Sequence, residues 1–184
     1  MKTSEPDILI VENFFREPDN LFASLMQSVV WDERMRARKT ASFGVSYDYS
    51  GVEYPQTEMH PMLLPVCDRI ESELGFRPNN CLLNYYPNGD STMGYHSDSS
   101  EELRDGTGVA IVSLGAERLI VYRSKKDKQV KYKYQLKSGA LLYMSKEIQE
   151  HWMHAIPKQN GCGERISLTF RQIIKEISKN RIGN

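Results

Sequence analysis

The sequence predicts a single α+β domain in which two N-terminal helices pack outside a strand-rich sandwich or barrel. The chain has 184 residues, a length that suits one domain with a sizeable core. Apolar residues recur at helical spacing before residue 80, whereas short apolar or alternating runs separated by turn residues follow it. A jelly roll is one architecture that accommodates such closely spaced strands.

The first 80 residues carry the signals for both helices. Pro18 suits the first turn of the first helix, because its missing N–H needs no partner there. Gly75 is placed to cap the end of the second helix. The expected elements are a strand at 8–11, helices at 18–31 and 63–74, and a loop or hairpin at 40–59.

The sequence after residue 80 predicts the strands of the sandwich. Each run is apolar or alternates between apolar and polar residues, and turn signals such as Ser138-Gly139 separate the runs. No internal repeat and no low-complexity linker divides the chain. The predicted strands are CLLNYY, VAIVSLG, RLIVYRS, VKYKYQL, ALLYM and RISLTFRQI.

Composition excludes several classes of protein. Apolar residues make up 40% of the chain and charged residues 26%, as in ordinary soluble domains. No apolar run approaches the roughly eighteen residues of a membrane helix, and the start of the chain lacks the pattern of a signal peptide. Three cysteines without CxxC spacing argue against a disulfide framework or a zinc ribbon. We therefore expect a cytoplasmic protein, or a nuclear one in a eukaryote.

Charge is unevenly distributed along the chain, although the net charge is zero. Segment 34–39 carries four basic residues in six, and segment 123–137 carries seven basic residues and one acid. A single run of this kind is usually a solvated face. Two such clusters in one small neutral domain are consistent with a phosphate-binding face.

The stretch GYHSDSS, residues 94–100, places His96 and Asp98 two positions apart. In a strand these side chains point to the same face, so they could present an imidazole and a carboxylate to one ion. With a second histidine they would form the facial triad of non-haem Fe(II) oxygenases. An HxD pair alone is more often a polar pair on the surface.

The second histidine has to come from elsewhere in the chain, which contains four histidines in all. His60 precedes Pro61 at a helix start, away from the predicted strands, and is set aside. The segment EHWMHAIP offers His151 and His154, and either could return from a later strand to meet the first pair.

The last predicted strand contains Arg165 and Arg171, six positions apart in the alternating run RISLTFR. Both therefore face the same way. Two inward arginines would be costly without an anion partner, and a dicarboxylate cosubstrate would supply one with matching bidentate geometry. The alternative is an edge strand whose arginines face solvent.

Taken together, these motifs resemble the AlkB family of Fe(II)/2-oxoglutarate-dependent dioxygenases, most closely the homologues that repair alkylated DNA. The resemblance covers roughly residues 80–173, and more faintly 37–51. The motifs that carry it are NYY (84–86), HSD (96–98), HWMHAIP (151–157) and RISLTFR (165–171).

The resemblance implies a double-stranded β-helix fold, with helices and a substrate-recognition lid in 1–80 and the jelly-roll core in 81–173. It also implies Fe(II), 2-oxoglutarate as cosubstrate, and O2. The implied catalytic iron ligands are His96, Asp98 and His154.

His154 is preferred to His151 because it stands in the HAIP context, and His151 then becomes a neighbouring core or supporting histidine. One of the two arginines would pair with the distal carboxylate of 2-oxoglutarate. The residues implied to contact this cosubstrate are Asn84, Tyr86, Arg165, Ser167 and Arg171.

The aromatic stretch SYDYSG resembles the family's lid, in which Tyr47 or Tyr49 would stack on a flipped base. The alternative is that both tyrosines only pack the loop. The family usually has an acid two residues after the HxD motif, where this chain has Ser100 with Glu101 adjacent. This departure leaves the base preference open. Arg123 is the first candidate among the basic residues for a phosphate contact.

The expected activity is oxidative demethylation of N-alkylated bases, of the 1-methyladenine or 3-methylcytosine type, in DNA or RNA, with release of formaldehyde, succinate and CO2. The absence of a long finger insertion favours single-stranded substrate, and we expect a monomer without membrane contact. Ser100 and the zero net charge favour an alternative, a same-fold oxygenase acting on a protein or small molecule. A non-catalytic binding module is disfavoured because every metal and cosubstrate position holds a competent residue.

Overall fold

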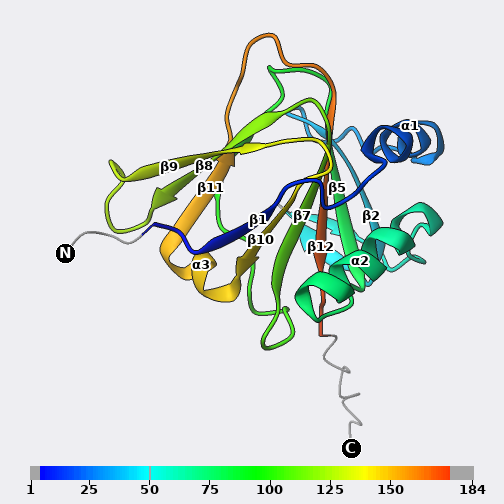
Figure 1. Cartoon of the computed structure of the whole chain (residues 1–184), viewed down its shortest axis with the longest axis horizontal. Coiled ribbons are helices and arrows are strands. Elements are labelled where there is room, and N and C mark those ends of the chain that lie inside the picture. The colour runs from blue at the N-terminus through cyan, green and yellow to red at the C-terminus, as the bar shows by residue number, and fades with distance from the viewer. Residues whose placement is uncertain (1–4, 50, 175–184) are drawn as a thin grey trace, which may run out of the picture.

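Two antiparallel sheets face each other and form the body of the molecule (Figure 1). The computed structural model of the chain describes residues 5–49 and 51–174. The larger sheet has the strand order β1-β10-β7-β12-β5-β2, and the smaller has the order β6-β11-β8-β9. A separate hairpin pairs β3 with β4.

The strands have the following bounds: β1 Ile8–Val11, β2 Lys39–Gly44, β3 Tyr47–Tyr49, β4 Val52–Tyr54, β5 Asn80–Tyr86, β6 Met93–His96, β7 Gly108–Gly115, β8 Arg118–Ser124, β9 Lys131–Leu136, β10 Leu141–Ser145, β11 Trp152–Ile156 and β12 Arg165–Arg171. The helices are α1 Pro18–Ser28, the short 3-10 helix η1 Pro61–Leu63, α2 Leu64–Leu74 and α3 Lys146–His151.

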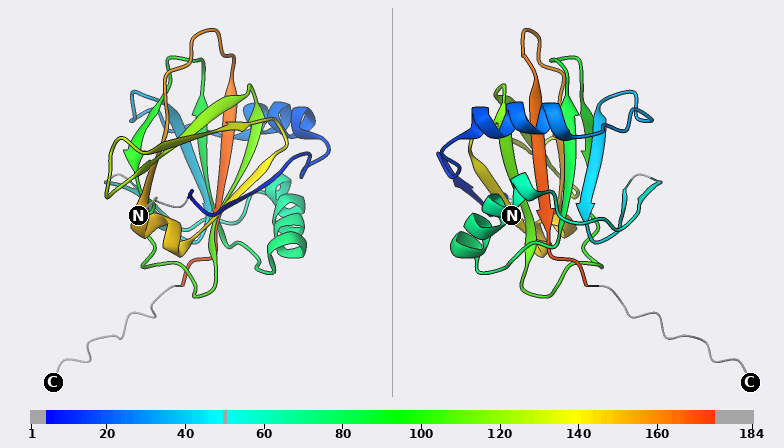
Figure 2. Two further views of the ribbon diagram at one scale, coloured as in Figure 1. Left: turned by 60° about the vertical axis from the view of Figure 1, so that its left-hand side comes forward. Right: turned by 90° about the vertical axis from the view of Figure 1, so that its right-hand side faces the viewer.

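The outer face of the larger sheet is covered by α1 and α2 (Figure 2). In β12 the apolar residues Ile166, Leu168 and Phe170 face these helices and belong to the cluster that also contains Leu21 and Ile70. The intervening residues of β12 face the space between the sheets, as strand geometry requires. They are Arg165, Ser167, Thr169 and Arg171.

A second apolar cluster fills the space between the two sheets. Its members come from the facing sides of both sheets and from α3 and the loop before β7, and include Val109, Ile120, Leu142, Ile148 and Trp152. Part of this space also holds the polar side chains described below, next to apolar residues of the same cluster.

The predicted fold class is confirmed. The strand at 8–11 and both N-terminal helices are present, and Gly75 caps α2 with a φ of 75°. The segment 40–59 supplies both β2 and the β3–β4 hairpin. None of the helices in the described part of the chain is long and apolar enough to cross a bilayer.

The boundary expected at residue 80 does not separate helices from the strand core. Both β1 and β2 are members of the larger sheet, so the first 80 residues contribute two of its six strands. The sequence also gave no signal for α3, because six residues are too few to display a helical period.

Candidate metal centre and cosubstrate pocket

Cross-strand pairing places His96 directly opposite His154. The first lies at the end of β6 and the second in β11, and these antiparallel strands are neighbours in the smaller sheet. Their imidazole rings lie close together, with centroids 4.3 Å apart and planes tilted by 57°. Of the two downstream candidates, the sheet therefore brings His154 to the first histidine.

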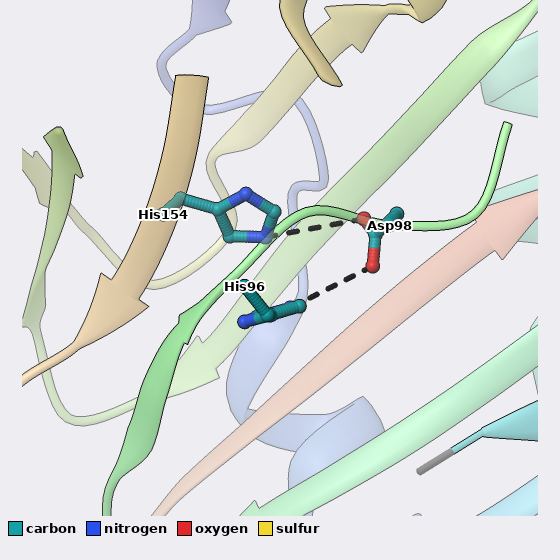
Figure 3. A group of neighbouring side chains, drawn as sticks. All are labelled: His96, Asp98 and His154. Carbon is teal, nitrogen blue, oxygen red and sulfur yellow. Dashed lines mark ion pairs between the residues drawn. The ribbon is translucent and has the colours of Figure 1, made fainter. Parts of the chain in front are cut away.

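Asp98 completes the triad from a position beyond the end of β6 (Figure 3). Its Oδ1 lies 3.6 Å from His96 Nε2, and its Oδ2 lies 3.9 Å from His154 Nε2. One ligand atom from each residue can be chosen so that all three lie within 4.8 Å of one another. Strand alternation does not account for this placement, because Asp98 is outside the strand.

Contacts from other segments hold Asp98 in place. Arg171 Nη2 donates a hydrogen bond to its Oδ1 at 3.3 Å. The backbone N–H of Asp98 donates to Oε1 of Gln149 at 2.9 Å, and the preceding Ser97 Oγ donates to the carbonyl of Trp152 at 2.9 Å.

The electrostatics keep the ligand groups in their metal-binding forms. Burial by itself would raise the pKa of Asp98, but Arg171 and the two histidines outweigh it and hold that pKa well below its usual range. Burial lowers the pKa of His154 to about 4. At neutral pH the site therefore contains a carboxylate and, at His154, a neutral imidazole, the protonation states that bind metals.

The residues present fit an iron ion. Asp98 Oδ2 is buried and accepts no hydrogen bond from the residues that the structure describes. A cation between the carboxylate and the two imidazoles would satisfy that oxygen. Two imidazoles and one carboxylate, with further positions left for other ligands, form the donor set typical of non-haem Fe(II) oxygenases.

A single pocket joins this triad to all five residues expected to contact the cosubstrate. Its polar lining consists of His96, Asp98, His154, Asn84, Tyr86, Arg165, Ser167, Thr169 and Arg171. Its apolar lining consists of Leu82, Met93, Ile111, Ile120, Leu136 and Ile156.

Arg165 is a fully buried cation whose hydrogen-bond partner is neutral. Its Nη2 donates to Ser113 Oγ at 2.9 Å, and its guanidinium carbon lies 5.2 Å from the centre of the Tyr86 ring. No carboxylate in the described parts of the chain forms an ion pair with it. Burial lowers its pKa to about 10, so it remains charged at neutral pH. An anionic ligand would match this guanidinium.

Two further buried arginines, which no sequence motif indicated, contact residues that line the pocket. Arg38 Nε donates to Asn84 Oδ1 at 2.8 Å. Arg118 is fully buried, and its guanidinium carbon lies 5.5 Å from the Tyr86 ring centre. Alternation along RLIVYRS could have revealed Arg118, because it shares an inward face with Ile120. Arg118 donates to the carbonyls of Asn88, Ser91 and Pro157.

The two remaining histidines lie away from the triad. His60 caps η1 by accepting a hydrogen bond from the N–H of Met62 at 3.2 Å, as its sequence position suggested. His151 is exposed at the end of α3, so the expectation of a core or supporting role for its side chain was wrong.

Of the two candidate stacking tyrosines, the structure describes the side chain of Tyr47 alone. Tyr47 is only 3% exposed, and the guanidinium carbon of Arg171 lies 4.4 Å from the centre of its ring. This tyrosine packs the hairpin onto the domain, in line with the alternative interpretation. The side chain of Tyr49 lies outside the described residues. Ser100 is half-buried and Glu101 is exposed, and neither lines the pocket.

The basic cluster at 34–39 does not form one cationic surface. Arg34 is paired with Asp32 and Lys39 with Glu33, while Arg38 turns inward. Acidic neighbours that lie outside the basic run therefore neutralise much of it.

The cluster at 123–137 remains largely unneutralised by the described residues. Lys131 and Lys133 are exposed on the outward side of β9, and neither forms an ion pair with residues 5–49 or 51–174. Arg123 stacks over Tyr95, with its guanidinium carbon 3.9 Å from the ring centre.

The jelly-roll sandwich, the His-Asp-His triad and the arginine-lined pocket are features typical of Fe(II)- and 2-oxoglutarate-dependent oxygenases. The family model of the 2OG-Fe(II) oxygenase superfamily matches residues 15–171, and the chain belongs to that superfamily. Within it, the chain is similar to AlkB homologues, as the motifs had suggested.

Two curated relatives come from Bos taurus. Alpha-ketoglutarate-dependent dioxygenase alkB homolog 3 is 32% identical over 178 residues, which cover 86% of this chain and 62% of the relative. DNA oxidative demethylase ALKBH2 is 34% identical over 149 residues, which cover 74% of this chain and 53% of the relative. The chain thus spans less than two thirds of the length of either relative.

A solved structure, that of OsALKBH1, supports the fold. It superposes with a TM-score of 0.68 over 93% of this chain and 100% of that one, at 18% sequence identity. At this identity the likeness concerns the fold alone.

Proposed function

We propose that this protein oxidatively demethylates N-alkylated nucleobases in single-stranded DNA or RNA and releases formaldehyde, succinate and CO2. One observation carries the oxygenase part of the proposal. A single pocket is lined both by the His-Asp-His triad and by Arg165, a buried cation without a carboxylate partner among the described residues. The substrate class follows from the chain's similarity to AlkB homologues, one of which is named a DNA oxidative demethylase.

In this proposal His96, Asp98 and His154 hold the iron. Fe(II), when bound, supplies the oxidation of the N-alkyl group with O2 and 2-oxoglutarate as co-reactants. Arg165 receives the distal carboxylate of 2-oxoglutarate. Asn84, Tyr86 and Ser167 orient the cosubstrate from neighbouring positions of the same pocket.

Arg171 has a different task from Arg165, because its guanidinium is paired with Asp98. We assign it to the iron ligand rather than to the distal carboxylate. The apolar side chains of the pocket exclude water around the reacting groups.

The nucleic-acid strand contacts the outward side of the smaller sheet in this proposal. Arg123, Lys131 and Lys133 would hold its phosphates, which position the strand without reading its sequence. Tyr49, on the lid hairpin, is the candidate for stacking on the target base. Ser100 stands where the family usually has an acid, and the adjacent Glu101 is the acid nearest in sequence that could contact a charged base.

The test is a mass-spectrometric assay of single-stranded oligonucleotides that contain 1-methyladenine or 3-methylcytosine. With Fe(II) and 2-oxoglutarate present, each modified base should lose the mass of its methyl group in exchange for hydrogen. The Asp98→Ala variant and reactions without 2-oxoglutarate serve as controls. Failure of the unsubstituted protein to demethylate any oligonucleotide would contradict the proposed substrate.

A second candidate is an oxygenase of the same fold that acts on a protein or small molecule. The ion pairs within segment 32–39 favour it, because they remove one of the two expected phosphate-binding clusters. Steady succinate formation that oligonucleotides neither accelerate nor inhibit would favour this candidate. Affinity for oligonucleotides that falls steeply with salt would favour the first.

A further inference from the structure

The iron ligand Asp98 receives its main-chain support from α3. It lies two residues beyond the last residue of β6, so the strand ladder does not extend to it. Its backbone N–H instead donates to the side-chain Oε1 of Gln149 at 2.9 Å, and both residues are buried, at 8% and 3% exposure. One amide side chain therefore supports the backbone of a ligand that comes from a distant segment.

The amide of Gln149 can be oriented in only one way. The N–H of Asp98 requires an acceptor, so Oε1 must point toward it and Nε2 must point away. In that orientation Nε2 is buried and has no hydrogen-bond partner among the described residues. A buried amide with an unsatisfied NH2 group costs stability. Gln149 is thus poorly suited to a purely structural role.

The helix that carries Gln149 is itself fixed to the turn after β8. Lys125 Nζ donates to the backbone carbonyl of Gln149 at 2.6 Å, and the N–H of Lys125 donates to the carbonyl of His151 at 2.9 Å. Next to Asp98 in the chain, Ser97 Oγ donates to the carbonyl of Trp152, the residue after α3, at 2.9 Å. These bonds fix the distance over which the glutamine side chain reaches Asp98.

We propose that Gln149 is a positioning residue for the metal centre, which sets the backbone at Asp98 so that its carboxylate meets both imidazoles. This inference rests on the proposed iron ligands, but it does not depend on the substrate. Side chains that orient metal ligands typically change metal affinity by about ten- to a hundredfold when they are replaced.

The test uses metal-free protein and Co(II), an ion whose visible absorption reports the geometry of its ligands. Gln149→Met keeps the length of the side chain but removes the acceptor, whereas Gln149→Glu keeps an acceptor oxygen at the same reach. Glu150→Ala, at the next and exposed position of α3, is the matched control. Each variant is titrated with Co(II), and its melting temperature is measured without metal.

We expect Gln149→Met to weaken Co(II) binding by about ten- to a hundredfold and to alter the absorption bands. The melting temperature of the metal-free protein should change little, because the loss of the unsatisfied NH2 group offsets the loss of the acceptor for the Asp98 N–H. Gln149→Glu should recover most of the affinity, and Glu150→Ala should match the unsubstituted protein.

Three results would overturn the inference. The first is Co(II) affinity in Gln149→Met within about twofold of the unsubstituted protein. The second is a joint loss of affinity and melting temperature in that variant that Gln149→Glu does not restore, which would indicate a structural role. The third is failure of the unsubstituted protein to bind Co(II), which would contradict the proposed ligands and the role of Gln149 with them. Normal Co(II) binding without any demethylation would overturn only the proposed substrate.

Discussion

Arg171 donates a hydrogen bond to the carboxylate of Asp98 at 3.3 Å, and both side chains are almost fully buried. The same guanidinium stacks on the ring of Tyr47 in the β3–β4 hairpin. Arg171, which lies in β12, thus joins the β3–β4 hairpin to the metal centre. Arg165, six residues earlier in β12, has no such ion-pair partner in the described residues, so the two arginines should respond differently to substitution.

Replacing Arg171 should weaken metal binding at mildly acidic pH. Without its cation, the burial of Asp98 is no longer offset, and the pKa of that carboxyl rises. Protons then compete with the metal for the carboxylate. As the pH is lowered, Arg171→Gln should therefore release Co(II) at a higher pH than the unsubstituted protein does. Calorimetric titration over a series of pH values measures this, with exposed Arg36→Gln as the control. Identical pH profiles would exclude a role for Arg171 in charging Asp98.

Replacing Arg165 should weaken 2-oxoglutarate binding and leave metal affinity nearly unchanged. A lost charge-assisted hydrogen bond in a closed site costs about 1.5–3 kcal/mol, or roughly ten- to a hundredfold in affinity. Arg165→Ala should therefore raise the KM for 2-oxoglutarate by that factor, and Arg165→Lys by less. Titration of the Co(II)-loaded protein with 2-oxoglutarate checks the same step without turnover. An unaltered KM would show that another residue receives the distal carboxylate.

Substitutions of His154 and His151 should have different effects on metal binding and activity. His154→Ala removes a buried side chain that faces Asp98 and should abolish both metal binding and turnover. His151→Ala alters an exposed side chain and should retain most of both. Succinate formation and Co(II) binding are the measurements. The assignment is wrong if His151→Ala loses metal and His154→Ala keeps it.

The metal-free protein should lose stability as the pH falls from about 6.5 to about 4. His154 has a pKa of about 4 in the folded chain against an ordinary value of 6.5, so in this window the unfolded chain binds a proton that the folded chain does not. The free energy of unfolding therefore decreases with decreasing pH, by up to about 3 kcal/mol from this residue. Urea unfolding at several pH values measures the effect.

Matched histidine variants identify the residue that causes this pH dependence of stability. His154→Asn should remove much of the pH dependence in this window, whereas His151→Asn, at an exposed position, should leave it in place. Equal slopes in all three proteins would mean that other groups account for the acid sensitivity.

Oligonucleotide binding should depend on the lysines of β9. Each phosphate contact contributes about one to the slope of log affinity against log salt concentration, and somewhat less for single strands. The double variant Lys131→Ala and Lys133→Ala should therefore weaken binding and flatten the slope by between one and two, by fluorescence anisotropy. Arg34→Ala is the control, because Asp32 already neutralises that arginine. A slope unchanged in the double variant would show that the phosphates do not contact this face of the smaller sheet.

The sequence by itself determined the features that depend on short-range periodicity. Alternation in β12 was enough to place Arg165 and Arg171 on the same face of the strand, because successive side chains of a strand point to opposite sides. Only the sheet order showed that this face points inward. The helices, the Gly75 cap and the triad motifs were equally local in their signals. The resemblance carried by those motifs added the order in which the ligands occur.

Only the tertiary structure decided which side chains contact one another. Asp98 lies beyond its strand and is held by Gln149 and Arg171, which lie 51 and 73 residues further along the chain. The inward turn of Arg38 depended likewise on strand pairing between distant segments. A periodic pattern reports which face a side chain occupies. It does not report which side chain of another strand lies opposite, because that depends on the register and packing of the assembled sheets.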